Sequence, residues 1–205
     1  MQGPTPPPSN PTRAGETTRL LRRVADGEQG LEGQLLELLY GELRQVAGAL
    51  MRGERDDHTL QPTALLHEAW LRLDLGGLDA GSCRGQFLRL ASRAMRGVLV
   101  DHARRRNALK RGSGRRLVAV DEEAQLSGEA GAIRVDQVLE IEEVLGRLAG
   151  RDPELAQIVE MRFFGGVSAA EIGAALGKTR RQIEASWAFA RGWLRRELER
   201  GDAVG

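Results

Sequence analysis

The sequence predicts an all-α protein with two small helical domains joined by a flexible linker. Aromatic residues make up only 4% of the 205 residues, and Ala, Leu, Arg and Glu outnumber the β-branched residues that favour strands. Apolar residues recur at three- and four-residue steps, and no convincing period-two strand pattern is found. Residues 168–198 add a third observation, because two helix-start signals there flank a glycine that favours a tight turn.

The N-terminal segment, residues 1–16, is expected to be a disordered tail. Five of the seven prolines lie within residues 1–12, and this stretch has no apolar run. It therefore lacks the apolar core that a signal peptide requires. No stretch of about 18 apolar residues occurs in the chain, so no transmembrane helix and no membrane partner are expected.

Residues 17–111 are predicted to form the first domain. We expect helices over residues 18–25, from near residue 30 to residue 50, from Pro62 onward, and from Phe87 to Lys110. The second of these carries a broad leucine stripe that faces a core, and proline suits the first turn of a helix. We also expect Phe87 to belong to the core.

Residues 112–132 are predicted to be a linker, and residues 133–200 a four-helix domain. The linker is rich in glycine and mixed charge. In the second domain, Asp152-Pro153 combines an N-cap residue with a proline at the first helical position. Gly165-Gly166 is expected to end that helix.

The last two helices are predicted to form a helix-turn-helix. Ser168 with Glu171 and Thr179 with Gln182 fit capping boxes, and Gly177 suits the C-terminal end of the short helix between them. Because the second helix begins with basic residues and a glutamine, the motif indicates binding to double-stranded DNA. The alternative is an ordinary helical hairpin with a solvated basic face.

Charge is unevenly distributed although the formal net charge is only +1. Residues 84–116 contain eleven Arg or Lys and one acid, whereas residues 117–171 contain twelve acids and four basic residues. Such a concentrated basic segment suggests a polyanionic partner. The single cysteine, Cys83, excludes a disulfide within the chain and a cysteine cluster for zinc, which fits a cytoplasmic setting.

Three motifs in order resemble the extracytoplasmic-function (ECF, group 4) RNA polymerase sigma factors of the sigma-70 superfamily. The segment His58–Leu73, HTLQPTALLHEAWLRL, resembles the core-polymerase-binding segment of that family. Val100–Arg106, VDHARRR, resembles the end of its promoter-reading helix. Val159–Ser168 and Ala190–Leu198 resemble its second domain, so the likeness covers about residues 18–200.

The resemblance implies a dissociable subunit that binds RNA polymerase core, directs it to promoters and opens the DNA. Residues 17–111 would be the region 2 domain and residues 133–200 the region 4 domain. The implied partners are the clamp helices of the largest polymerase subunit, the flap of the second-largest subunit, promoter DNA and an anti-sigma factor as a further candidate. The resemblance implies neither an enzyme nor a cofactor, and we find no catalytic or metal-binding residues.

The implied polymerase contacts lie in the first motif, at Leu60, Leu65, Glu68, Trp70, Leu71 and Arg72. Core packing is the alternative for Leu65, Trp70 and Leu71. Glu68 and Arg72 are four residues apart, so an intrahelical ion pair is their alternative.

The implied minus-ten contacts lie on the long basic helix. They are Arg89, Arg93, Arg96, Asp101, His102, Arg104, Arg105 and Arg106. Cations there would neutralise phosphates while exposed bases stack or enter pockets. The alternative is a solvated basic face. Asp101 is expected to position Arg104 or Arg105, since no nucleophile accompanies Asp101 and His102.

The implied minus-thirty-five contacts lie at the start of the last long helix. They are Lys178, Thr179, Arg180, Arg181, Gln182, Glu184, Ala185 and Ser186. The chain departs from its relatives at Glu184, where they usually carry a basic residue. Glu184 either accepts from cytosine N4 or repels phosphate. We therefore expect a different promoter preference and weaker upstream binding.

Two other functions compete with a sigma factor: a helix-turn-helix regulator that acts without polymerase, and a helical protein-interaction adaptor. A regulator has no use for the first motif, and an adaptor predicts no salt-dependent DNA affinity. We also expect the free protein to bind promoter duplex poorly, with acidic residues 121–143 folding back over the basic helix.

Overall fold

The computed structural model describes residues 11–51, 60–75, 78, 82–110 and 138–202. Within these ranges all regular structure is helical, which confirms the predicted all-α class. In chain order the helices are α1 (Pro11–Ala25), α2 (Glu32–Leu50), α3 (Pro62–Arg72), α4 (Arg84–Lys110), α5 (Val138–Arg151), α6 (Pro153–Val159), the π-helical segment η2 (Glu160–Phe164), α7 (Ala169–Leu176) and α8 (Arg180–Asp202).

Two helix boundaries differ from those the sequence predicts. Helix α1 begins at Pro11, before the expected residue 18, because proline is acceptable in a first helical turn. The helix that starts at Pro153 was expected to run to Gly165. Instead α6 ends at Val159 and continues as the π-helical segment η2, which Gly165 caps. The predicted linker, residues 112–132, lies outside the described residues.

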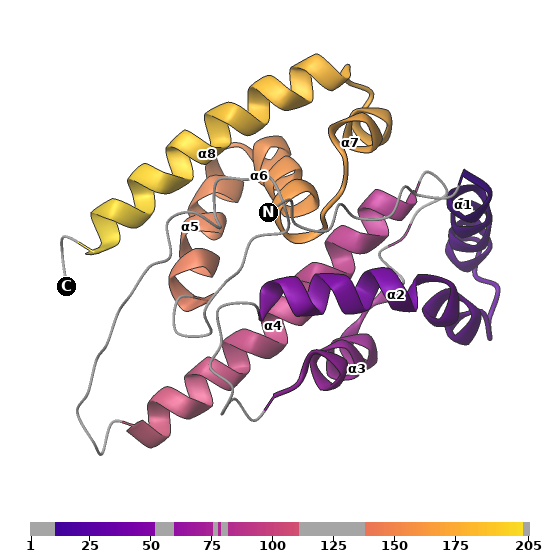
Figure 1. Ribbon diagram of the computed structural model, residues 1–205, viewed down its shortest axis with the longest axis horizontal. Helices are drawn as coiled ribbons and strands as arrows, with labels where there is room; N and C mark the ends of the chain where they lie inside the picture. The colour runs from indigo at the N-terminus through magenta and orange to yellow at the C-terminus, as the bar shows by residue number, and fades with distance from the viewer. Residues whose placement is uncertain (1–10, 52–59, 76–77, 79–81, 111–137, 203–205) are drawn as a thin grey trace, which may run out of the picture.

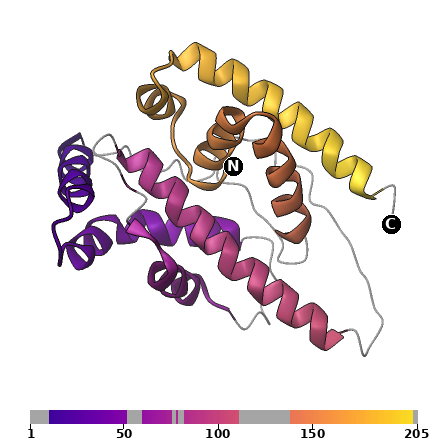
Figure 2. The same cartoon turned by 180° about the vertical axis from the view of Figure 1, so that it is seen from behind.

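Helix α4 runs through the middle of the molecule. Helices α1–α4, the N-terminal bundle, lie together, and α5–α8 with η2, the C-terminal bundle, lie against the other side of α4 (Figures 1 and 2). The closest neighbours of α4 are α3 from the first bundle and η2 from the second. One helix thus carries contacts to both bundles.

The core of the N-terminal bundle forms where apolar helix faces meet. The leucine stripe of α2 is buried as predicted, and Phe87 of α4 is completely enclosed. Trp70 of α3 is half-buried, with its ring centroid 6.3 Å from that of Phe87. The residues at the centre of this bundle are Leu21, Leu35, Leu39, Leu43, Leu50, Leu65, Leu66, Phe87, Leu88 and Met95.

The C-terminal bundle is ordered by local caps as well as by packing. Asp152 accepts a hydrogen bond from the Leu155 amide at 2.9 Å, and Pro153 follows it, as the sequence predicts. After η2 the chain reverses at Gly166, whose φ of 62° favours glycine. Ile158, Val159, Phe164, Ile172, Ile183 and Ala190 form the interior.

Leu65→Ala and Leu71→Ala should differ sharply in stability although both residues lie on α3. Leu65 is 0% exposed and Leu71 is 87% exposed. Removing the buried side chain leaves a cavity and should lower the free energy of unfolding by about 2–5 kcal/mol. Removing the exposed one should change it by no more than about 0.5 kcal/mol. Urea denaturation followed by circular dichroism measures both, and equal losses would contradict this placement.

Candidate nucleic-acid interface

The predicted polymerase-binding residues divide into a buried group and an exposed group. Leu65 is core, whereas Leu71 is the most exposed large apolar side chain among the described residues. Leu60 and Trp70 are half-buried against the core. The surface of α3 therefore presents an apolar side chain flanked by the charges of Glu68 and Arg72.

Those two charged residues form a small network on the surface. Arg72 donates to Glu68 at 2.7 Å, so the intrahelical pair given as their alternative is present, and to Asp101 of α4 at 2.6 Å. Asp101 was expected to position Arg104 or Arg105, and in the structure its carboxylate accepts from Arg72. Because α3 packs beside α4, the guanidinium of Arg72 lies between the carboxylates of Glu68 and Asp101 and donates a hydrogen bond to each.

The cations of α4 also divide by exposure. Arg93, Arg104 and Arg105 are exposed, and the end of α4 projects beyond the neighbouring helices (Figure 1). Arg106 lies in the helix, but its side chain is outside the described part. His102 is half-buried and has an interaction partner. The exposed cations are free to meet phosphate groups.

Arg89 and Arg96 lie on the face of α4 that the C-terminal bundle covers. The side chain of Arg96 is 1% exposed, donates to Glu142 of α5, and donates to Glu160 of η2 at 2.9 Å. Its Cζ lies 4.1 Å from the centroid of the Phe164 ring. Arg89 donates to the other oxygen of Glu160 at 3.1 Å.

The expected folding of residues 121–143 over the basic helix falls partly within the described chain. Residues 121–137 lie outside it, but Glu142 belongs to this stretch and contacts Arg96. The predicted list did not include Glu142, Glu160 or Phe164. The charge of the two glutamates and the aromatic ring of Phe164 are evident in the sequence. These residues lie far from Arg96 along the chain, however, so no local sequence pattern links them to it.

The short helix α7, the turn of residues 177–179 and α8 follow the predicted caps. Ser168 and Glu171 form a complete capping box, and Gly177 is left-handed with φ 65°. The Thr179 hydroxyl oxygen accepts a hydrogen bond from the backbone N–H of Gln182 at 3.3 Å. In return, the side-chain oxygen Oε1 of Gln182 accepts from the backbone N–H and from the hydroxyl of Thr179, at 2.8 Å each. Both predicted helix-start signals are therefore confirmed.

The predicted minus-thirty-five residues cluster at this end of α8, and several already have partners. Lys178 pairs with Glu154 at 3.0 Å, and Arg180 pairs with Glu184 at 2.7 Å. Ala185 is exposed and Ser186 is half-buried. Arg181 is exposed, and within the described residues the structure gives its guanidinium no ion pair.

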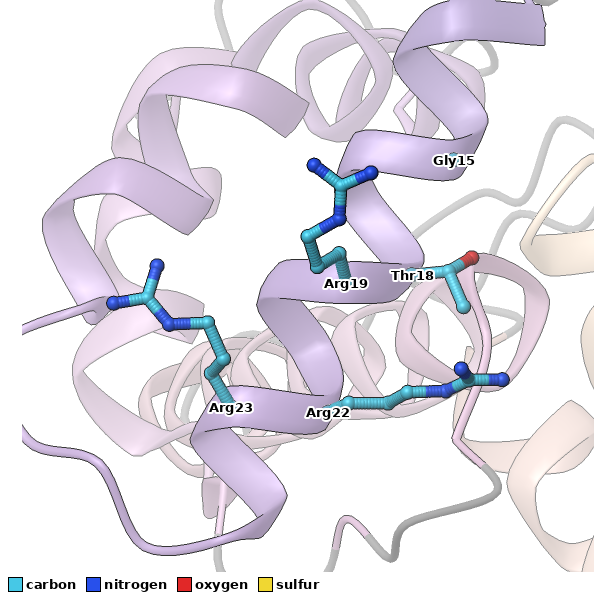
Figure 3. A pocket seen from close by; sticks show the side chains of 5 residues that line it. All are labelled: Gly15, Thr18, Arg19, Arg22 and Arg23. Carbon is cyan, nitrogen blue, oxygen red and sulfur yellow. The ribbon is translucent and has the colours of Figure 1, made fainter.

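A hollow on α1 is lined by arginines that point in different directions, so it does not form a compact anion-binding site. It is lined by Gly15, Thr18, Arg19, Arg22 and Arg23. In Figure 3 the three arginines fan out from the helix instead of converging on one point. Arg23 is also paired with Glu28 at 2.7 Å, and this hydrogen bond lowers the pKa of Glu28.

Two further searches cover the described part of the chain. There, no three His, Cys, Asp or Glu side chains gather in a group that could hold a metal ion. None of the helices seen is both long and apolar enough to cross a membrane. Cys83 is a half-buried free thiol just before α4.

An all-helical chain with a cationic central helix and a capped helix–turn–helix end has the features of a DNA-binding transcription protein. The sequence profile of the family described as ECF sigma factor matches residues 14–200, so the chain belongs to that family. Comparison with curated proteins gave no match. The chain is therefore a sigma factor that binds RNA polymerase and promoter DNA in transcription initiation. Its family is one of non-enzymatic transcription factors, and a regulator that acts without polymerase is not favoured.

Gly173→Ala should destabilise the protein although alanine favours helices. A Cβ on Gly173 would lie 2.5 Å from the carbonyl oxygen of Lys178, so the turn before α8 would have to shift. We expect a loss of about 1–3 kcal/mol in unfolding free energy.

Gly146→Ala in α5 is the matched control for that prediction. A Cβ there meets nothing within 4 Å, and the substitution should stabilise the protein by up to about 1 kcal/mol. Thermal melting compares the two variants. A gain in Gly173→Ala as large as that in Gly146→Ala would show that the turn is not tightly packed against α7.

Proposed function

We propose that the exposed face of α3 is the surface that docks on the clamp helices of the largest polymerase subunit. The observation that carries this proposal is the 87% exposure of Leu71 beside the charged residues Glu68 and Arg72. Covering such an exposed apolar side chain with a partner removes its surface from water, which is favourable. Leu65 supports the surface from within, and Leu60 and Trp70 lie at its border with the core.

The promoter contacts follow from the exposed cations of the two bundles. The minus-ten element would meet α4, with Arg93, Arg104, Arg105 and Arg106 near the phosphates and Asp101 and His102 beside them. The minus-thirty-five element would meet the start of α8, from Lys178 to Ser186. There Arg181 is exposed, which supports its assignment as a contact.

The proposed roles are assigned to successive segments of the chain. Residues 17–111 would act as the region 2 domain, residues 133–200 as the region 4 domain, and residues 112–132 as the linker. The C-terminal bundle would reach the flap of the second-largest polymerase subunit, and an anti-sigma factor is a candidate regulator. The protein would work in the cytoplasm beside the polymerase and would catalyse no reaction itself.

Leu71→Ser should prevent assembly with polymerase core while leaving the fold intact. Burying a leucine side chain contributes about 2 kcal/mol, so its loss from the interface corresponds to roughly 30-fold weaker binding. Co-elution with purified bacterial core polymerase and run-off transcription on a pool of upstream genomic DNA measure the effect.

Phe189→Ser is the matched control because Phe189 of α8 is the other exposed large apolar side chain among the described residues and lies outside the proposed docking surface on α3. It should bind and transcribe like the wild type. If Leu71→Ser also assembled normally, the docking surface would lie elsewhere. If the wild-type protein bound duplex DNA in a salt-sensitive way but never co-eluted with core, a polymerase-independent regulator would be the better description.

Arg181→Ala should weaken binding to the upstream promoter element more than Arg195→Ala does. Both changes remove one positive charge from α8, but Arg195 lies at its far end and pairs with Glu199 at 2.9 Å. A lost phosphate contact should lower the slope of log affinity against log salt by about one. Anisotropy titrations of holoenzyme on a promoter obtained by run-off transcription test this. Equal effects of the two variants would remove Arg181 from the interface.

A further inference from the structure

We propose that Glu184 is a positioning residue that orients Arg180 to read a guanine in the upstream promoter element. The inference rests on the proposed function, which places the minus-thirty-five element at the start of α8. It goes beyond that function by separating the roles of two neighbouring arginines. Arg180 would recognise one base pair, whereas Arg181 would contact phosphate.

The ion pair between Arg180 and Glu184, here called the brace, lies on the surface of α8. Arg180 Nε donates to Glu184 Oε1 at 2.7 Å. The arginine side chain is 73% exposed and the glutamate side chain 50% exposed, so both can be reached by DNA. Among the residues that the structure describes, no other group accepts a hydrogen bond from Arg180. The carboxylate of Glu184 therefore limits where this guanidinium points.

The brace leaves the outer edge of the guanidinium free. An arginine carries its N–H donors in a rigid planar fork, and the brace uses the one on Nε. The donors on Nη1 and Nη2 remain, and they lie side by side at the end of the fork. Guanine presents N7 and O6 as neighbouring acceptors in the major groove, and paired N–H donors bind both together. The carboxylate thus leaves free the edge of Arg180 that suits guanine.

Helix stability does not account for the pair. Exposed ion pairs at this spacing stabilise a helix only slightly, and the better order places the acid before the base. In α8 the arginine comes first. It also lies in the first turn, which contains no acid and where the positive end of the helix dipole disfavours a cation. A cation at this position is better explained by a role in binding.

Arg181 shows what an arginine without a brace offers. It is exposed, and the described part of the chain provides no ion pair for it. Such a side chain keeps its rotamer freedom, which suits a phosphate because a phosphate can be approached from many directions. A base edge needs two donors in one plane, so an arginine that is ordered in advance has the advantage there. The two neighbouring positions therefore suit different parts of the DNA.

The brace acts through the cost of ordering a side chain. A free arginine loses conformational freedom when it binds a base, and this loss reduces the gain from the contact. Arg180 has lost part of that freedom before DNA arrives. The pair is also neutral overall, so it adds little to the general attraction for phosphates. Glu184 therefore lowers general affinity and raises discrimination at one base pair, which links the expected weaker upstream binding to the expected change in promoter preference.

The test measures base preference with holoenzyme assembled from the full-length protein and purified bacterial core polymerase. A duplex pool carries a promoter found by run-off transcription with its upstream element randomised, and the bound duplexes are sequenced. Arg180→Ala should reduce the preference for guanine at one position by about tenfold. Glu184→Ala should reduce the preference at the same position by about threefold and leave the other positions unchanged.

The combined variant shows whether Glu184 acts through Arg180. If it does, adding Glu184→Ala to Arg180→Ala should cause no further loss of preference at that position. Independent losses at two different positions would overturn the proposal. They would mean that Glu184 itself accepts from a base, for which cytosine N4 is the suitable donor.

Glu184→Gln separates the brace from simple repulsion of phosphate. The amide oxygen can still accept from Arg180 Nε although the charge is gone. This variant should therefore keep more of the guanine preference than Glu184→Ala does. Repulsion alone predicts that both variants bind every sequence more tightly with unchanged base preference, and that result would overturn the proposal.

Glu199→Ala is the matched control. Arg195 Nε donates to Glu199 Oε1 at 2.9 Å, which is the same pair in the same order on the same helix. This pair lies at the far end of α8, away from the proposed DNA contacts, so its loss should leave base preference as in the wild type. A shift as large as that of Glu184→Ala would reveal a general charge effect and contradict the brace.

Co-elution with polymerase core, measured on the same proteins, separates this proposal from the proposed function. Normal assembly of all variants, with a base preference that does not depend on Arg180, would reject the brace and retain the sigma role. If the wild type does not assemble, the polymerase surface is rejected, and the free protein is given a fully randomised duplex pool at low salt. A guanine preference that weakens in Arg180→Ala and Glu184→Ala would then retain the brace, and its absence would reject the brace as well.

Discussion

The arrangement depends on one constraint: α4 is covered on opposite sides by two groups of helices. The N-terminal bundle packs against its apolar side, as expected for an amphipathic helix. The other side is cationic, and a cationic face can be covered only by groups that neutralise it. Glu142, Glu160 and Glu171 meet that requirement. The position of the C-terminal bundle thus depends on carboxylates as well as on apolar packing.

Membership of the ECF sigma factor family gives this arrangement a functional meaning. A sigma factor must offer one surface to polymerase and others to DNA. Helices α3 and α4 pack side by side, α8 packs on α5, α6 and α7, and all three carry exposed charge. The exposed Leu71 and the exposed Arg181 belong to different bundles. In the proposed function, their separation along the chain would let one small protein contact two promoter elements and the enzyme together.

Local signals allowed much of this fold to be predicted from sequence. The caps at Asp152 and Ser168 and the left-handed Gly177 act within a few residues, so their effects could be read directly. The surroundings of Arg96 could not be read in this way, because its partners lie 46 and 64 residues further along the chain. The π-helical segment was also missed, since no glycine or proline interrupts residues 160–164. Core packing was left open for Leu71, and only the packing of α3 shows that this side chain is exposed.

The start of α8 restricts what its glutamine can recognise. The side-chain oxygen of Gln182 is occupied by the amide and hydroxyl of Thr179, so its NH₂ group is the part left to face a base. In that state Gln182 can donate to purine N7, guanine O6 or thymine O4, but it cannot accept from adenine N6 or cytosine N4. Bidentate recognition of adenine would require the cap to break. If Gln182 contacts a base as proposed, one amide group links helix initiation to base preference.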